Sequence, residues 1–418
     1  MRCVQFCLLW RSRVKRLAMK KITLVMLAAQ ILTLLGFAAY PVALVAIQNE
    51  WALNNFQSGL IASSFFLGYV LVVPFATTLT DRMDAKRIYM LGGFLTALGV
   101  FCFGFLARDY WQASLCMVIN GAGFAASYMP GLKIISDRLD ASELSRPIAF
   151  YTAFFGVGTG FSYLIAGSLL PIFGWRMVFI GISMAPILAL LLVYFSVEEI
   201  KRHAHSKNIQ FTLADVVPIV RWREVLKNKQ ASHFILGYGI HCLELFASRN
   251  WIVAYLIFCS AHGQAELPMA IPVLVGLINF IGVPSSILGN EMAHRVGRQK
   301  WIHGVMLLSF VSAIALSLVY DQAWGVIVFF AILHMVFIMA DSSTLTAGLV
   351  LSAKSEVKGA AMGLHSLVGF VGGLTGPALF GFILDESQKA QFQNPWSYAY
   401  FSIVVLSFVF ALGHWLRR

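Results

Sequence analysis

Long apolar runs alternate with short polar turns along the whole chain. An α-helix needs about 20 apolar residues to cross the hydrocarbon layer, whereas a barrel strand needs only about 10. Only helices and closed barrels satisfy the backbone inside lipid. The pattern therefore predicts an all-α membrane protein with twelve transmembrane helices. We place these spans at about 22–47, 55–80, 88–107, 111–135, 148–170, 176–196, 231–259, 267–289, 301–320, 323–350, 357–384 and 396–416.

Composition agrees with this pattern. Of the 418 residues, 59% are hydrophobic and only 12% are charged, whereas a soluble domain carries about 25% charge. The net charge of +12 is a topology signal. If both termini lie on one side, that side holds 26 of the 31 Lys and Arg residues and the other side holds three. Such an asymmetry is typical of cytoplasmic loops, so we expect cytoplasmic termini and no nucleic-acid partner.

The largest polar interval, about 197–230, divides the spans six and six. We therefore predict a basic N-terminus (1–21), an N-terminal six-helix bundle (22–196, the N-half), a basic linker (197–230) and a C-terminal six-helix bundle (231–418, the C-half). The later part of the linker has the pattern of an amphipathic surface helix. Met19 followed by two lysines and an apolar run is typical of a bacterial start, and a start there would leave residues 1–18 upstream.

An internal repeat supports the two halves. The turn "TTLTDRMDAKR" (77–87) follows the second span, and "NEMAHRVGRQK" (290–300) follows the eighth. Each turn combines polar residues, an arginine and a basic cluster at the same point of its half. Parallel six-helix halves are one known transporter architecture.

At these turns the chain resembles the major facilitator superfamily (MFS) of secondary transporters, whose motif is Gly-x-x-x-Asp-Arg-x-Gly-Arg-Lys/Arg. The first turn lacks both motif glycines, which are replaced by Thr77 and Asp84. Ala85 stands where the first basic residue of the motif is expected. In the second turn His294 replaces the aspartate. The positions that match are Asp81, Arg82, Lys86 and Arg87 in the first turn and Arg295, Gly297 and Arg298 in the second.

The resemblance extends over essentially the whole chain, and some segments look like bacterial nitrate- or cyanate-type permeases. It implies two pseudo-symmetric six-helix bundles whose first, fourth, seventh and tenth helices line a central cavity. It also implies a gating motif formed by Asp81, Arg82 and Arg295. A carboxylate such as Asp81 is favoured at a helix N-terminus, where it would hold the cytoplasmic side shut. A solvated charged turn is the alternative.

Seven ionisable groups fall inside the predicted spans, where each charge costs about 2.5 kcal/mol or more. Six of the seven lie on the spans that the resemblance assigns to the cavity. These groups are Lys133 in the fourth span, His241, Glu244 and Arg249 in the seventh, His334 and Asp341 in the tenth, and His365 in the eleventh.

Their spacing predicts two roles. Burial in a low dielectric favours the neutral form of a carboxyl group, so Glu244 and Asp341 are candidate proton carriers. His241 lies three residues from Glu244, on the same helix face, and His334 lies seven from Asp341. Arg249 keeps its proton and binds anions well. We therefore predict proton coupling by these four residues, and substrate binding by Arg249 with Lys133, Gln30 and Tyr40.

Structural alternatives remain for each group. Glu244 and Arg249 would neutralise each other as a pair, although they are five residues apart. Asp341 would cap a kink or bond to the hydroxyls that follow it. Lys133 would reach the membrane surface. The histidines of the tenth and eleventh spans would be packing residues, and Tyr40 would belong to a kink at Pro41.

The leading hypothesis is a transporter in the cytoplasmic (inner) membrane of a bacterium. It would move a small anionic solute by alternating access, as a monomeric proton symporter that imports its cargo. One alternative is transport of a larger siderophore- or drug-like molecule in either direction, and another is a non-transporting membrane sensor. The chain has no motif of an enzyme or an ATP-driven pump, and its six cysteines lack metal-ligand spacing. We expect no cofactor.

Overall fold

A computed structural model describes residues 21–140, 144–200, 216, 218–263, 267 and 269–415, without the side chains of residues 81, 145, 355, 414 and 415. Within these residues, eleven helical stretches are long and apolar enough to cross a membrane. One of them, Arg146–Ser196, covers 51 residues, far more than one span needs. Its helix is interrupted at Gly174, where φ is 70° and ψ is 163°. This stretch is therefore two spans, and the prediction of twelve transmembrane helices is confirmed.

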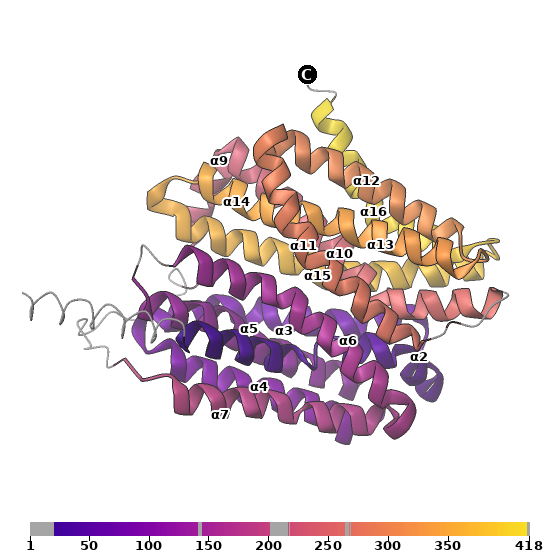
Figure 1. Cartoon of the computed structure of the whole chain (residues 1–418), viewed down its shortest axis with the longest axis horizontal. Coiled ribbons are helices and arrows are strands. Elements are labelled where there is room, and N and C mark those ends of the chain that lie inside the picture. Colours follow the sequence, from indigo (N-terminus) through magenta and orange to yellow (C-terminus); the bar gives the residue numbers. More distant parts are fainter. Residues whose placement is uncertain are drawn as a thin grey trace, which may run out of the picture.

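The two halves of the chain lie side by side, and their helices run in roughly the same direction (Figure 1). The N-half contains a helix at residues 21–34, followed by α2 (Ala39–Trp51), α3 (Asn55–Arg82), α4 (Ala85–Phe105), α5 (Tyr110–Arg138), α6 (Ser145–Ile182) and α7 (Met184–Ser196). The C-half contains α10 (Lys229–His262), α11 (Ile271–Val296), α12 (Arg298–Leu318), α13 (Trp324–Ala340), α14 (Ser342–Ser352), a 3₁₀ turn (Ser355–Val357), α15 (Lys358–Lys389) and α16 (Pro395–Trp415).

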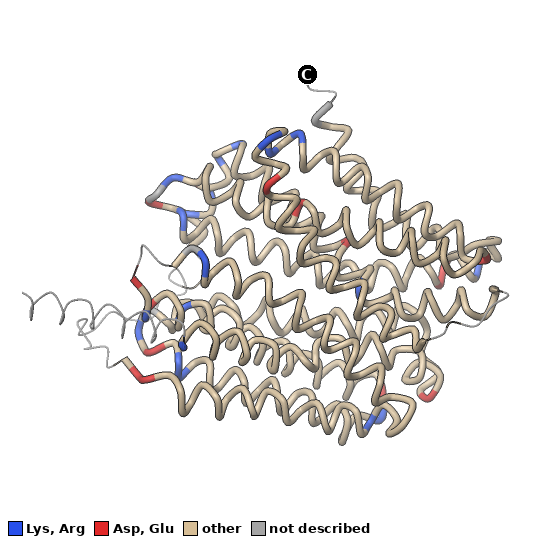
Figure 2. Tube along the Cα trace, viewed as in Figure 1, with Lys and Arg blue, Asp and Glu red and all other residues tan. Residues whose placement is uncertain are grey.

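Lys and Arg residues gather at one end of the bundle, which we call the basic end (Figure 2). The turns after α3 and α11 and the last turn of α5 lie there. The linker helix α9 (Ile219–Lys227) also lies at this end (Figure 1). The end of α15 lies at the other end, which we call the far end. A cytoplasmic position of the basic end remains a prediction from the charge asymmetry.

Two of the described spans are broken, and at each break a side chain from another helix contacts the freed backbone. The first span turns at residues 35–38, just before Pro41, whose ring supplies no backbone N–H. The hydroxyl of Ser162 on α6 donates to the Leu35 carbonyl and accepts from the Ala38 N–H at 2.9 Å. The tenth span breaks at Asp341, between α13 and α14. There the indole N–H of Trp301 donates to the Ala340 carbonyl at 3.0 Å. Side chains thus satisfy the backbone groups that each break frees.

Glycines bring the two halves into close contact. A side chain added at Gly381 on α15 would meet the backbone of Asn55 on α3, and one at Gly160 on α6 would meet the ring of Phe280 on α11. These positions lie in the glycine-rich stretches of the fifth and eleventh spans, where small residues at helical spacing are typical of close helix packing. The two seams between the halves, α3 against α15 and α6 against α11, therefore have little room for larger residues.

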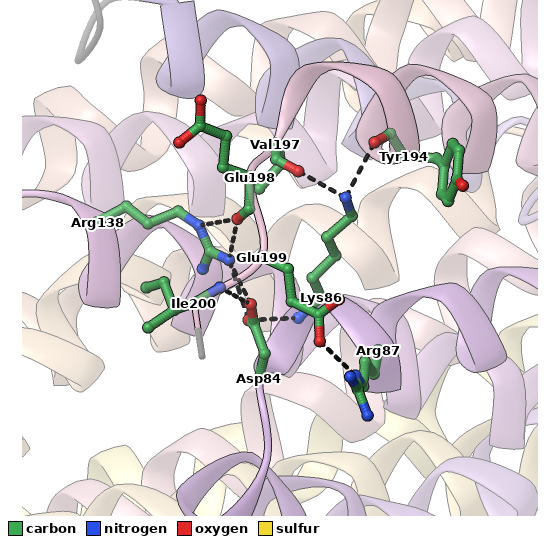
Figure 3. Close-up of polar contacts among 9 residues, drawn as sticks. All are labelled: Asp84, Lys86, Arg87, Arg138, Tyr194, Val197, Glu198, Glu199 and Ile200. Atoms are coloured by element: carbon green, nitrogen blue, oxygen red, sulfur yellow. Dashed lines mark hydrogen bonds and ion pairs between the residues drawn. The ribbon is translucent and has the colours of Figure 1, made fainter. Parts of the chain in front are cut away.

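A buried ion pair ties the start of the linker to the N-half at the basic end (Figure 3). Asp84, which occupies a motif glycine position, caps α4 by accepting from the Lys86 N–H at 3.0 Å. It also accepts from Arg138 of α5 at 2.8 Å and from the Ile200 N–H at 2.6 Å. Arg138 in turn donates to the Glu198 carbonyl at 2.7 Å. The carboxylate therefore holds three separate segments together.

We expect Asp84→Ala to destabilise the protein by about 3 kcal/mol, because the buried Arg138 and two backbone N–H groups would lose their acceptor. The apparent Tm in detergent should fall. Burial raises the pKa of Asp84, but the hydrogen bonds to its neighbours and the Arg138 charge outweigh burial and hold it below 3.8. The stabilisation is therefore fully present above pH 3.8 and is lost as the pH falls further.

Glu199→Ala is the matched control, because Glu199 pairs with Arg87 in the same cluster at 2.5 Å but both side chains are largely exposed. Exposed pairs contribute about 1 kcal/mol at most. Equal Tm values for the two variants would contradict a structural role for Asp84.

Candidate functional site

Helix α10 carries three buried ionisable side chains. His241 and Glu244 are each 2% exposed, and Arg249 is 3% exposed. The whole stretch from Ile240 to Leu256 is buried, because α10 contacts α15, α14 and α16 of its own half and α2 of the other. These three side chains are therefore enclosed within the protein.

Glu244 is held by hydroxyl groups of its own half. Ser309 on α12 donates to one carboxylate oxygen and Ser407 on α16 donates to the other, both at 2.5 Å. His334 on α13 approaches to 4.0 Å through Nδ1. The structure does not pair Glu244 with Arg249, so the expected alternative of mutual neutralisation is not formed.

Asp341 lies at the break between α13 and α14 but makes no capping hydrogen bond with its side chain. Its Oδ1 lies 2.8 Å from Nδ1 of His241, although the ring N–H is not aimed along the line that joins them. The Tyr238 ring stacks on His365 at 3.8 Å between centroids, and Nε2 of His365 lies 3.2 Å from the hydroxyl of Thr346. His365 therefore has its own partners, Tyr238 and Thr346, within the C-half.

The result is two crossed pairs between the same two spans. The imidazole of α10 faces the carboxyl at the α13–α14 break, and the carboxyl of α10 faces the imidazole of α13. The second imidazole, His334, also lies 3.0 Å from the Ser248 hydroxyl through Nε2. The four residues predicted for proton coupling are thus brought together as two carboxyl–imidazole pairs.

Arg249 has a different environment. Its Nε donates to the Asn279 side chain on α11 at 3.1 Å, and Nη2 lies 3.9 Å from the sulfur of Met339. The guanidinium lies 5.9 Å from the centre of the Phe155 ring of the other half. Within the described part of the chain, no carboxylate lies within 4.0 Å of it. Arg249 is therefore a buried cation without a charged partner there.

A cavity of about 30 Å³ opens beside Arg249, at the contact between the two halves. This volume holds little more than one water molecule. The Asn250 amide also lines it, and neither polar atom of that side chain has a hydrogen-bond partner. The rest of the lining is mainly aromatic and apolar: Phe37, Tyr40, Pro41, Ala62, Phe65, Phe66, Met117, Tyr163 and Phe246.

The other residues predicted for substrate binding are placed differently. Tyr40 lines the cavity, and its hydroxyl donates to the Ser58 carbonyl at 2.8 Å. Gln30 is buried with its amide nitrogen unpartnered, but it does not line the cavity. Lys133 lies five residues before the end of α5 and pairs with Asp137 at 2.9 Å. The structure therefore joins Tyr40 to Arg249 but does not join Lys133 or Gln30 to this cavity.

The predicted gating residues lie at the basic end. The side chain of Asp81 lies outside the described residues, and Arg82 is exposed. Arg295 is exposed as well, and among the described residues it reaches only Glu291 of its own helix, at 4.0 Å. The role of these three residues as a gate remains a prediction.

Sequence reasoning missed a contact between the halves at the far end. Asp385, at the end of α15, accepts from the backbone N–H groups of Asn55 and Phe56 at 3.0 and 2.8 Å and from the Asn55 side chain at 2.8 Å. These N–H groups form the N-terminus of α3, which favours a negative charge. An acidic residue at the end of an apolar span was the available signal, but its partner lies 330 positions away.

We expect Asp385→Ala to open the far end, because loss of three hydrogen bonds to a charged acceptor costs a few kcal/mol. The measurement is the labelling rate of Ala62→Cys, in the cavity lining, by a membrane-impermeant maleimide added at the far end. The rate should rise by about tenfold or more. Glu386→Ala is the matched control, since Glu386 pairs only with Lys389 of its own helix among the described residues. An unchanged rate in Asp385→Ala would contradict a closing role.

A larger hollow of about 600 Å³ lies at the basic end of the C-half. It is lined by the ends of α10, α11, α12 and α14 and contains none of the predicted site residues. We assign the site to the small cavity beside Arg249, because there the Arg249 guanidinium and the unpartnered Asn250 amide meet residues of both halves.

Comparison with known proteins agrees with the fold. The chain is 25% identical to the probable L-galactonate transporter of Escherichia coli (strain K12), over 90% of this chain and 85% of that protein. It is 22% identical to the benzoate transport protein of Acinetobacter baylyi, over 83% and 79%. The crystal structure of a bacterial homologue of the human lysosomal transporter Spinster superposes with a TM-score of 0.76 at 17% identity, covering 94% of this chain and 95% of that one. Residues 26–377 match the family model of the Major Facilitator Superfamily, and the chain therefore belongs to this superfamily of membrane transporters.

Proposed function

We propose that this transporter imports small organic carboxylates together with protons across the cytoplasmic membrane of a bacterium. The observation that carries the proposal is the separation of charges in the C-half. Both buried carboxyl groups face imidazoles, whereas Arg249 has no carboxylate partner in the described structure. An anionic cargo would supply that partner.

A buried arginine without a counter-ion is costly, by several kcal/mol even after relaxation. A carboxylate offsets this cost because it accepts two parallel hydrogen bonds from a guanidinium. The curated relatives named above are described as transporters of L-galactonate and of benzoate, and both of these compounds are carboxylates. These facts favour an organic carboxylate over an inorganic anion.

Protons would bind at the two carboxyl–imidazole pairs. The broken tenth span connects these pairs with the anion site, because Met339 contacts Arg249 and Asp341, two residues later, contacts His241. A movement of this break when cargo arrives would therefore change the surroundings of a proton-binding group. This coupling through one span is the physical basis for symport in our proposal.

The charge asymmetry and the contacts between the halves are consistent with the proposed import. If the basic end is cytoplasmic, the Asp385 contact closes the external side in this conformation. Rocking of the two halves would then close one side of the transporter and open the other, as in other transporters with parallel repeats. Cargo released at the basic end would enter the cell.

The test is uptake of radiolabelled carboxylates into vesicles that contain the purified protein, with and without an inside-alkaline pH gradient. Neutral aromatic acids cross bilayers unaided, so initial rates in protein-free vesicles are subtracted. We expect saturable uptake that the gradient stimulates. Uptake that does not depend on the gradient would contradict the proton coupling. If none of the carboxylates is taken up in a saturable manner, the proposed function is wrong.

A further inference from the structure

The lining of the small cavity points to the chemistry of the cargo beyond its carboxylate. Resting on the proposed carboxylate transport, we propose that the cargo is an aromatic monocarboxylate, and that polyhydroxylated sugar acids and dicarboxylates are rejected. Three features of the cavity carry this proposal: its rings, its spare hydrogen-bonding groups and its single cation.

Rings from both halves meet at the cavity. Phe37, Phe65 and Phe66 come from the N-half and Phe246 from the C-half. The Phe66 and Phe246 rings lie 4.5 Å apart between centroids, and Phe37 meets Phe65 edge to face at 5.4 Å. Offset and edge-to-face contacts are the preferred geometries of aromatic pairs. A flat ring that enters when the halves separate would replace one of these ring contacts with another of the same kind.

Few polar groups of the lining are free to bind a hydroxyl. The Tyr40 hydroxyl already donates to the Ser58 carbonyl, and the Tyr163 hydroxyl already donates to the Arg249 carbonyl. The unpartnered groups that remain in the described lining are the Asn250 amide and part of the Arg249 guanidinium. A carboxylate uses both. Each hydroxyl of a sugar acid that is buried without a partner would lower affinity roughly tenfold.

The charge of the lining limits the cargo to one carboxylate. Among the described residues that line the cavity, Arg249 is the only Lys or Arg. A second carboxylate would be buried beside aromatic rings, without a cation to offset its desolvation. This argument separates monocarboxylates from dicarboxylates of the same size.

The test is a binding series on the purified full-length protein in detergent, by thermal shift and calorimetry. The ligands are benzoate, cyclohexanecarboxylate, gluconate, terephthalate and neutral benzamide. We expect benzoate to bind at least tenfold more tightly than gluconate, terephthalate and benzamide, and more tightly than cyclohexanecarboxylate. Gluconate or terephthalate binding as tightly as benzoate would overturn the inference and leave the proposed function intact. Failure of every carboxylate in the series would overturn both.

A variant pair tests the rings directly. Phe246→Leu should weaken benzoate binding about 2- to 10-fold, the range for loss of an aromatic contact, and should change cyclohexanecarboxylate binding less. Phe280→Leu is the control, because Phe280 contacts Phe161 at the seam between the halves without lining the cavity. Equal losses for the two ligands in Phe246→Leu would contradict a ring-specific contact. The ligand series on the unaltered protein decides the question if Phe246→Leu does not fold.

Discussion

Replacing Arg249 with alanine is expected to lower the affinity for carboxylates by about 10- to 100-fold, because each hydrogen bond to a charged group contributes about 1.5–3 kcal/mol. Arg249 is the cation of the cavity lining, and its hydrogen bond to Asn279 holds the guanidinium in place. The cargo would lose both its charge partner and its orientation. The measurement is calorimetric titration with benzoate, and initial uptake rates in vesicles should fall in parallel.

Two further variants make this prediction specific. Arg249→Lys keeps the charge but loses the planar donor pair, so its affinity should lie between those of the wild type and Arg249→Ala. Arg223→Ala removes an exposed arginine of α9 and should leave affinity within about twofold. If Arg249→Ala binds benzoate normally while remaining folded, the arginine is structural and the anion site lies elsewhere.

Replacing Glu244 with glutamine is expected to abolish stimulation by a pH gradient while leaving exchange of cargo between the two sides. Glutamine has nearly the same shape and can still accept from Ser309, whose hydroxyl binds Glu244 in the structure. It cannot bind or release a proton. A gradient of one pH unit is equivalent to about tenfold in cargo ratio for one coupled proton, and this is the gain that Glu244→Gln should lose.

The assay compares gradient-driven uptake with counterflow in the same vesicles, after subtraction of protein-free controls. Glu224→Gln is the matched control, because Glu224 is an exposed residue of α9 that pairs with Lys354 at 3.7 Å. It should behave like the wild type. If the gradient still stimulates uptake by Glu244→Gln, Glu244 is not the coupling residue and Asp341 takes that role. Asp341→Asn should then lose the stimulation by the gradient.

Much of the fold follows from local pattern. A run of about 20 apolar residues has few stable arrangements other than a membrane-spanning helix, so all twelve spans were predictable. The merged stretch Arg146–Ser196 required one additional argument, the break at Gly174. The breaks in the first and tenth spans were less predictable, because their free backbone groups are satisfied by Ser162 and Trp301 from distant helices.

The candidate site follows from the sequence only in part. Intramembrane charges mark functional positions because lipid penalises them, and this reasoning selects Glu244, Arg249 and Asp341 without a structure. It does not assign their partners. Spacing along α10 favoured a contact between His241 and Glu244, whereas the structure turns each of them toward a residue of the tenth span.

The sequence by itself therefore determined the environment of each segment. Apolar runs lie in lipid, basic turns lie in water, and a few charged side chains must be enclosed by protein. Pairing was decided by tertiary structure alone. The contact of Asp385 with Asn55, the aromatic lining beside Asn250 and the absence of an acidic partner for Arg249 among the described residues all join positions far apart in the chain. Side-chain contacts depend on distances of a few ångströms, and local periodicity contains no information about which distant helix supplies the neighbour.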